Sequence, residues 1–280
     1  MKRLENITGV IVPIIYHYLI SIIISGTLSI YIGYRENVDG IEAISDYYVS
    51  QGFGILTVGL TSLLSIPLFL WLMYFDEKHG WIQKWKKLSC RPSYIHWILL
   101  VPFSIFSALG LNQFLNVTRL TEVINGYHTT KQVLFSGSFF QSVIVLGIGV
   151  PIAEEFMFRG LVFRRLKNIV PVRVAVVISA LLFGIYHMNL IQFLYASVFG
   201  ILLAFIYEKF QNIAAPIIFH STANLFIYFA GNIKILGQKP YMAYSCIIGI
   251  CGMLLFELYY SKVQFDKKQI QYNKNIKNNK

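Results

Sequence analysis

Charged side chains are scarce in this chain. Only 13% of its 280 residues are Asp, Glu, Lys or Arg, whereas 56% are hydrophobic, and the mean hydropathy is +0.58. A soluble domain of this length needs far more charge to cover its surface. The composition therefore excludes an ordinary soluble protein and predicts an integral membrane protein.

Cysteine is nearly absent as well. The chain has three cysteines, Cys90, Cys246 and Cys251, and their spacing matches no metal-binding or redox motif. Cys90 lies in a basic loop, and the other two lie in an apolar stretch. We therefore expect no disulfide framework.

Acidic residues are the scarcer of the two charge types. The chain has 13 Asp and Glu against 24 Lys and Arg, which gives a net charge of +11. An excess of this size can indicate nucleic-acid binding, but here the basic residues lie beside apolar stretches. That position is typical of topology signals and of contacts with anionic lipid headgroups. We expect membrane lipids, and no nucleic acid, as partners.

Long apolar runs dominate the rest of the chain. Crossing the hydrocarbon core takes ~20 apolar residues, and eight stretches approach or exceed that length: 8–33, 52–75, 95–116, 132–163, 172–190, 191–208, 212–231 and 240–261. The first is too long for a signal-peptide core and lacks a clear cleavage site, so we interpret it as a retained anchor. The predicted fold class is all-α, a polytopic transmembrane helical bundle of about eight spans.

The basic residues predict the orientation of these spans. With eight spans, both termini lie on one side, and eighteen of the 24 lysines and arginines fall on that side, with five on the other and Arg159 inside a span. This asymmetry predicts that both termini are cytoplasmic. Residues 1–261 are predicted to form one transmembrane domain with its motif core at about 132–231. Residues 262–280 are predicted to be a basic cytoplasmic tail.

Spans five and six are short, and only Met188 and Asn189 separate them. One alternative is that each span crosses the membrane. The other is a hairpin that does not fully cross and packs within the bundle. The sequence leaves both open.

Two adjacent carboxylates, Glu154 and Glu155, stand in one of the most apolar parts of the chain. A carboxylate in a membrane helix is costly without a partner, and the default interpretation is a functional site. In a helix, Glu155 and Arg159 are i,i+4 neighbours that can pair. Glu154 points about 100° away from Glu155, so the two carboxylates need not share a role.

Two later segments carry further polar residues in apolar surroundings. Phe183 lies one helical turn before His187, while His220 and Asn224 lie on one face of the seventh span. Counting ~1.5 Å per residue from the nearest basic residues places Glu154, both histidines and Asn224 near the middle of a ~30 Å core. We therefore predict one buried polar site built from three helices.

Such a set of residues can hydrolyse an amide bond. A carboxylate can act as a general base on water, and a neighbouring histidine can hold or polarise that water. A second histidine and an asparagine amide can donate to a carbonyl oxygen that becomes negative during attack. Two histidines and a glutamate are also a zinc ligand set. Spacing leaves both metal-bound and metal-free water open, with Glu154, His187 and His220 as the candidate ligands.

These residues resemble the CPBP family of intramembrane proteases, which groups CAAX prenyl endopeptidases with bacteriocin-processing and self-immunity proteins and is also called the Abi family. The family pattern is Glu-Glu-x-x-x-Arg, then Phe-x-x-x-His, then His-x-x-x-Asn. Here it reads Glu154-Glu155-x-x-x-Arg159, Phe183-x-x-x-His187 and His220-x-x-x-Asn224. The resemblance covers roughly residues 150–225, and the three motifs in this order are far more specific than each alone.

The resemblance implies a helical-bundle protease of the bacterial cell membrane whose site opens toward the cytoplasm. It implies that Glu154 is the base on water, that His187 assists, and that His220 and Asn224 face the substrate carbonyl. Glu155 and Arg159 would hold the helix and the pocket. The candidate catalytic set is thus Glu154, Glu155, His187, His220 and Asn224, with Arg159 as an ion-pair partner in the site.

The implied substrate is a peptide or protein with a membrane-proximal cleavage site. The implied roles are peptide or bacteriocin maturation, self-immunity, or CAAX-type C-terminal processing. The family is described as metal-dependent, yet a glutamate-type mechanism needs no metal, so the resemblance leaves zinc open. The alternative hypothesis is a non-catalytic immunity or scaffold protein of the same fold, or a transporter that uses Glu154 and Glu155 as a proton relay.

Overall fold

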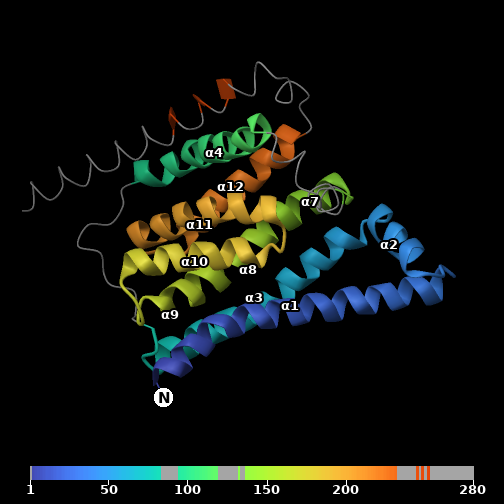
Figure 1. Cartoon of the computed structure of the whole chain (residues 1–280), viewed down its shortest axis with the longest axis horizontal. Helices are drawn as coiled ribbons and strands as arrows, with labels where there is room; N and C mark the ends of the chain where they lie inside the picture. The colour runs from blue at the N-terminus through green and yellow to red at the C-terminus, as the bar shows by residue number, and fades with distance from the viewer. Residues whose placement is uncertain are drawn as a thin grey trace, which may run out of the picture.

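The computed structural model describes residues 2–82, 94–118, 132, 136–231, 244–245, 247–248 and 251–252, with only the backbone described for residues 2–7 (Figure 1). The described residues form helices and no strand, which confirms the all-α prediction. The helices are α1 (Lys2–Arg35), α2 (Ile41–Ser50), α3 (Phe53–Lys78), α4 (Tyr94–Val117), α7 (Phe139–Ile144), α8 (Val150–Glu155), α9 (Arg164–Leu166), α10 (Val172–Tyr186), α11 (Leu190–Phe210) and α12 (Ala214–Gly231). The predicted tail, 262–280, lies outside the described residues, as does most of the predicted eighth span, 240–261.

Five helical segments are long and apolar enough to cross a membrane: Thr8–Arg35, Phe53–Lys78, Tyr94–Val117, Phe139–Leu166 and Leu190–Phe210. These segments make this a multi-pass membrane protein. The helix α10 has 15 residues and spans roughly 22 Å, which is less than the thickness of the hydrocarbon core. The count of eight spans and the side of the termini stay predictions.

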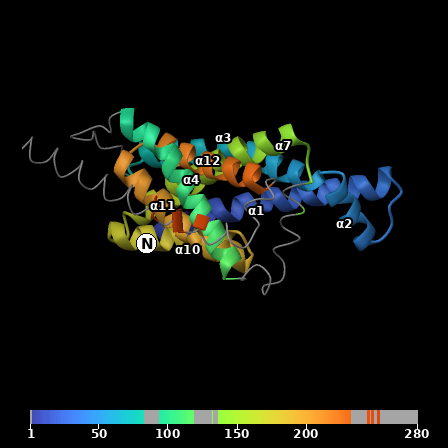
Figure 2. The same cartoon turned by 90° about the horizontal axis from the view of Figure 1, so that it is seen from above.

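The helices pack in a bundle in which segments distant in sequence lie side by side. α10 and α11 form an antiparallel pair, α12 packs against α4, and α1 packs against α3 (Figure 1). At one end of the bundle, α2 and the C-terminal part of α1 extend beyond the other helices (Figure 2). The segment Phe139–Leu166 contacts α1, α3, α10, α11 and α12. It therefore occupies the centre of the bundle and carries the predicted acidic pair.

This central segment is one continuous helix whose hydrogen-bond register changes twice. Two π-helical stretches, η1 (Val145–Gly149) and η2 (Phe156–Phe163), flank α8 on either side. Pro151 has no backbone N–H to donate to residue 147, which interrupts the α-helical ladder at η1. π-helical turns inside α-helices frequently accompany functional sites. The two acids of α8 thus lie between two such stretches.

The boundaries of this helix differ from the predicted span, 132–163. The helix begins at Phe139, after Ser138, whose side chain accepts a hydrogen bond of 3.3 Å from the backbone N–H of Gln141. It continues to Leu166, beyond the predicted end. The apolar run alone does not reveal these ends, because a cap and buried ion pairs set them.

Basic residues at the end of this helix pair with acids of α3. Arg165 donates to both carboxylate oxygens of Asp76, at 2.7 and 3.0 Å, and to the backbone carbonyl of Gly9 in α1. Arg164 pairs with Glu77 at 2.8 Å. The sequence predicted these arginines as topology signals only. The structure adds a packing role, because they join α9 to α1 and α3.

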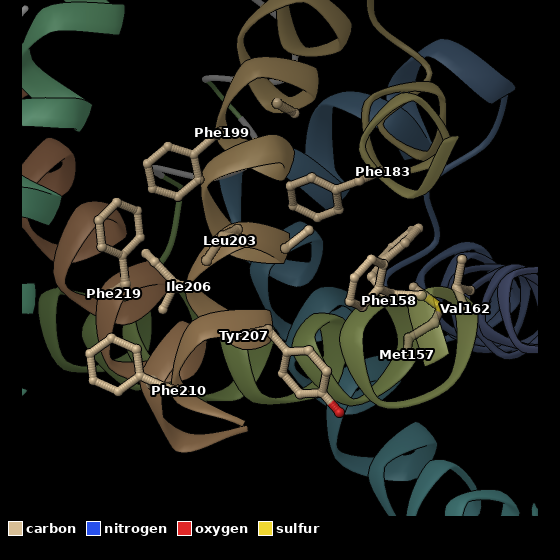
Figure 3. Packing of buried hydrophobic residues seen from close by; sticks show 14 of the residues in the cluster. Met157, Phe158, Val162, Phe183, Phe199, Leu203, Ile206, Tyr207, Phe210 and Phe219 are labelled. Carbon is tan, nitrogen blue, oxygen red and sulfur yellow. The ribbon is translucent and has the colours of Figure 1, made fainter. Parts of the chain in front are cut away.

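A tightly packed apolar core fills the bundle between α8 and α9. Figure 3 shows its aromatic rings and aliphatic side chains converging from the central helix, α10, α11 and α12. We call it the aromatic core; its members, each at most 4% exposed, are Met157, Phe158, Phe163, Phe183, Leu203, Ile206, Tyr207, Phe210 and Phe219.

Candidate active site

The two acids of α8 occupy different environments. Glu154 is 6% exposed and lines a cavity, whereas Glu155 is fully buried and does not line that cavity. Neighbouring residues of a helix point about 100° apart, so only one of the two can face the same space. The structure thereby separates two carboxylates that are adjacent in the sequence.

Glu155 holds two other site residues through a single oxygen. Its Oε1 accepts a hydrogen bond of 3.0 Å from Nη1 of Arg159 and another of 2.9 Å from Nδ1 of His220. The predicted i,i+4 ion pair is therefore present. Arg159 also donates to the carbonyl of Gly200 at 3.1 Å, and its guanidinium lies 4.7 Å from the ring centre of Phe183. This buried network joins the central helix to α10, α11 and α12.

His220 turns its second nitrogen toward Glu154. Because Glu155 accepts from Nδ1, the other nitrogen, Nε2, is the one left to face Glu154, at 3.7 Å from Oε2. This separation is too long for a hydrogen bond, and an ion pair across it requires the imidazole to be protonated. The rings of Phe183 and Phe199 pack edgewise on the imidazole and fix its plane.

His187 follows the last residue of α10 and is also fixed at one nitrogen. Its Nδ1 donates to the backbone carbonyl of Phe183 at 2.8 Å, and the Phe183 ring lies perpendicular to the imidazole. In the neutral ring this leaves Nε2 as a hydrogen-bond acceptor. Phe183, which the sequence places one helical turn before His187, is therefore a packing neighbour of the imidazole.

Asn224 is anchored to the first π-helical stretch. Its Nδ2 donates to the carbonyl of Leu146 in η1 at 3.0 Å. An asparagine amide nitrogen has two N–H groups, so one of them is left for another acceptor. The side chain lies one helical turn after His220 on α12, as the i,i+4 spacing indicated.

These side chains meet around one cavity of about 340 Å³. Its lining includes four of the predicted site residues, namely Glu154, His187, His220 and Asn224, whereas Glu155 and Arg159 lie outside it. The volume falls within the range of pockets that take small ligands. The depth argument from the sequence and the tertiary arrangement place the same four residues together.

Sequence reasoning missed two residues of the site, Tyr18 and Tyr186. Both line the cavity, and the hydroxyl of Tyr18 donates to the backbone carbonyl of Tyr186, the residue before His187. Next to Tyr18, the buried His17 forms a hydrogen bond of 2.9 Å with the hydroxyl of Ser65. α1 is thus part of the site, although no motif in its sequence indicated this.

The zinc alternative finds no support in the geometry. Within the described ranges, no group of three or more His, Cys, Asp or Glu side chains is placed to hold a metal ion. His187 and His220 each use Nδ1 for a hydrogen bond, to the Phe183 carbonyl and to Glu155, which leaves Nε2 as the nitrogen that could bind a metal. The three side chains do not fit a zinc site as they stand, and we derive no step through a metal.

Part of the chain is similar to a known protein family. Residues 136–226, which contain all three motifs, match the model of the family described as "Type II CAAX prenyl endopeptidase Rce1-like". The predicted resemblance is confirmed. The matched segment covers the central helix, the α10–α11 pair and most of α12, so it includes all six candidate residues of the site.

Two curated relatives align with parts of the chain. An 85-residue part, 30% of the chain, is 35% identical to the Bacillus subtilis protein named "Putative membrane peptidase YdiL" and covers 35% of that protein. A 137-residue part, 47% of the chain, is 28% identical to the Lactococcus lactis "UPF0177 protein YxdF" and covers 74% of it. The chain thus spans only about a third of the first relative. No solved structure matches the chain.

Proposed function

We propose that this protein is an intramembrane endopeptidase that hydrolyses a peptide bond with water activated by Glu154. The observation that carries the proposal is the cavity on which Glu154, His187, His220 and Asn224 converge from three segments of the chain. The match to the Rce1-like family over residues 136–226 and the name of the Bacillus subtilis relative support it.

The proposed reaction uses the polar atoms around the cavity that the hydrogen bonds described above leave available. Nε2 of His187 accepts a hydrogen bond from a water molecule, and Glu154 takes a proton from that water. The water oxygen forms a bond to the substrate carbonyl carbon, and the free N–H of Asn224 donates to the oxygen that becomes negative. The C–N bond then breaks, and the leaving nitrogen takes the proton from Glu154. Water and the peptide bond thus yield a carboxylate end and an amine end.

His220, Glu155 and Arg159 complete the arrangement. His220 lies between the two carboxylates, so when both of its nitrogens carry protons its ring can stabilise negative charge at Glu154 and at the substrate oxygen. Glu155 and Arg159 do not reach the cavity. We assign both of them positioning roles: Glu155 orients the His220 ring, and Arg159 fixes Glu155. Glu155, which belongs to the predicted catalytic set, is thus proposed not to contact the substrate.

For the membrane, the orientation and the cellular role we propose what the sequence predicted. The chain crosses a bacterial cell membrane in about eight spans with both termini in the cytoplasm, and the bacterial sources of both relatives agree with this setting. The substrate is a peptide or protein with a cleavage site in or beside the membrane. Peptide or bacteriocin maturation, self-immunity and CAAX-type processing are the roles that fit.

The experiment compares peptide termini made by wild type and by Glu154→Gln. Both are expressed at equal levels in a host that lacks the gene, with the neighbouring genes supplied, and new termini are mapped by mass spectrometry. We expect termini that appear with wild type and vanish with Glu154→Gln. The control is Glu208→Gln, a partly exposed acid at the far end of α11, which should leave the termini unchanged. Matching profiles for wild type and Glu154→Gln, with the phenotype retained, would support the non-catalytic alternative.

A further inference from the structure

Helix α10 ends at Tyr186, one residue before His187. The last four carbonyl groups of a helix have no partner within the helix, so they must find hydrogen-bond donors elsewhere. At this end of α10 they belong to residues 183–186. The donors that reach these four carbonyls therefore determine what holds the turn that carries His187.

Three of the four carbonyls accept hydrogen bonds from the turn itself. The side chain of His187 donates from Nδ1 to the Phe183 carbonyl at 2.8 Å. The backbone N–H of His187 donates to the Gly184 carbonyl at 3.1 Å, and that of Met188 donates to the Ile185 carbonyl at 3.0 Å. Because Nδ1 is one of these donors, the orientation of the imidazole depends on the geometry of the turn.

The fourth carbonyl, that of Tyr186, accepts a hydrogen bond from a distant helix. The donor is the hydroxyl of Tyr18 in α1, 168 positions away in the sequence. α1 lies outside residues 136–226, the segment that matches the family model. The turn that carries His187 is thus tied to a part of the chain that the family match does not include.

The turn between α10 and α11 depends on its surroundings. Met188 has a φ of 52°, in the left-handed region that residues with a Cβ rarely adopt, and such a conformation persists where the surrounding structure holds it. On the side of α11, Asn189 caps the helix by accepting from the backbone N–H groups of Ile191 and Gln192 at 3.0 and 3.2 Å. On the other side, the contact with Tyr18 holds the turn.

Tyr18 is kept in place by its neighbour in the sequence. The buried His17 forms a hydrogen bond of 2.9 Å with Ser65 of α3, and its ring stacks on Phe69 of the same helix. The His17 ring also meets the Tyr186 ring edge-on, with centroids 5.6 Å apart, and the ring of Tyr18 lies 5.3 Å from that of Tyr186. α3 thus fixes the rotation of α1, and α1 holds Tyr186 through two successive side chains.

We infer that Tyr18 is a positioning residue for the hydrolysis and that it acts through His187. Tyr18 lines the cavity, but its single O–H is donated to the Tyr186 carbonyl, so it has no proton to give to a substrate. Its role is to hold the turn so that Nε2 of His187 stays directed at the water molecule beside Glu154. The role in cleavage rests on the proposed function, whereas the contact between α1 and the turn is independent of catalysis.

The substitution Tyr18→Phe tests this inference, because it removes the hydroxyl and keeps the ring. The matched control is Tyr16→Phe, the same change two residues earlier in α1 at an exposed side chain. Cleavage is measured on the peptide that the Glu154→Gln comparison identifies. We expect Tyr18→Phe to lower kcat roughly 10-fold and to change KM less than about twofold, because the hydroxyl holds the turn and does not bind substrate. Tyr16→Phe should match wild type.

A second measurement reports on His187 without any cleavage. The protein is labelled with ¹⁵N-histidine, and the imidazole signals of His187 are assigned by their loss in His187→Gln. In wild type and in Tyr16→Phe we expect the tautomer with the proton on Nδ1, as the bond to the Phe183 carbonyl requires. In Tyr18→Phe both nitrogen shifts should move toward the average of the two tautomers.

Three results would overturn the inference: an unchanged kcat in Tyr18→Phe, unchanged His187 shifts in that variant, or equal changes in Tyr16→Phe. A lower melting temperature of Tyr18→Phe with unchanged kcat and shifts would show a purely structural contact and would overturn it as well. If wild type shows no cleavage that depends on Glu154 but the shifts move as expected, the proposed protease function fails and the hold of α1 on the His187 turn remains.

Discussion

Glu155 and His220, 65 positions apart in the sequence, are joined by a hydrogen bond of 2.9 Å between Oε1 and Nδ1. The same carboxylate oxygen accepts from Arg159, and these three buried side chains form a single network. Glu154, the next residue along the chain, stands outside this network and lines the cavity. The relationship separates a structural acid from a reactive one, and the first prediction follows from it.

Replacing Glu155 should reduce stability, whereas replacing Glu154 should reduce activity. Glu155→Gln leaves the guanidinium of Arg159 buried without a counter-charge, and breaking a buried pair costs about 3–5 kcal/mol. Glu154→Gln leaves that pair intact and removes the base, a loss of roughly 10²–10⁴-fold in rate. Thermal unfolding in detergent and a cleavage assay measure the two effects. Equal losses of stability in both variants would contradict the assigned roles.

The close contact of α10 with α11 should not tolerate a side chain at Gly184. A Cβ there would overlap Oγ of Ser197 and lie 2.8 Å from the backbone oxygen of Phe193. Gly184→Ala therefore pushes the helices apart, at a cost of about 1–3 kcal/mol. It also displaces His187, which lies three residues after Gly184. We expect a lower melting temperature and slower cleavage.

The control for that change is Gly26→Ala in α1. A Cβ at Gly26 would meet nothing within 4 Å, and alanine favours a helix over glycine by roughly 0.5–1 kcal/mol. The control should melt at or above the wild-type temperature. Similar losses at both positions would show that α10 and α11 do not pack as closely as the structure shows.

The ion pair between Asp76 and Arg165 should contribute more to stability than the pair between Lys167 and Glu208. Asp76 is fully buried and Arg165 binds it through two nitrogens. In the second pair the side chains are 26% and 30% exposed. Asp76→Asn should cost about 3–5 kcal/mol, and Glu208→Gln at most about 1 kcal/mol. Denaturation of the two variants in the same detergent tests the order, and a larger effect for Glu208→Gln would refute it.

Chelation should leave the proposed hydrolysis intact. Among the described residues no three potential ligands are placed to hold a metal ion. We expect purified protein to cleave its substrate at an unchanged rate after prolonged dialysis against EDTA. A loss of activity that added zinc restores would show that the side chains rearrange around a metal.

Much of the site followed from the sequence because its residues recur at helical spacing. The pairs Glu155–Arg159 and His220–Asn224 are i,i+4 neighbours, and local helix geometry alone brings each pair onto one face. The π-helical stretches around α8 did not follow, because their wider turns depend on a proline break and on packing against neighbouring helices. Tyr18 was missed since its contact is with the distant Tyr186.

The sequence by itself determined that this is a membrane protein, which residues carry the motifs and which loops are basic. Composition, helical spacing and charge are local or additive properties of the chain, so they can be derived without a structure. Only the tertiary structure decided that Glu154 faces the cavity while Glu155 holds His220, and that the hydroxyl of Tyr18 reaches the carbonyl of Tyr186. Those outcomes depend on how side chains from several helices fill the space between them, and no single helix contains that information.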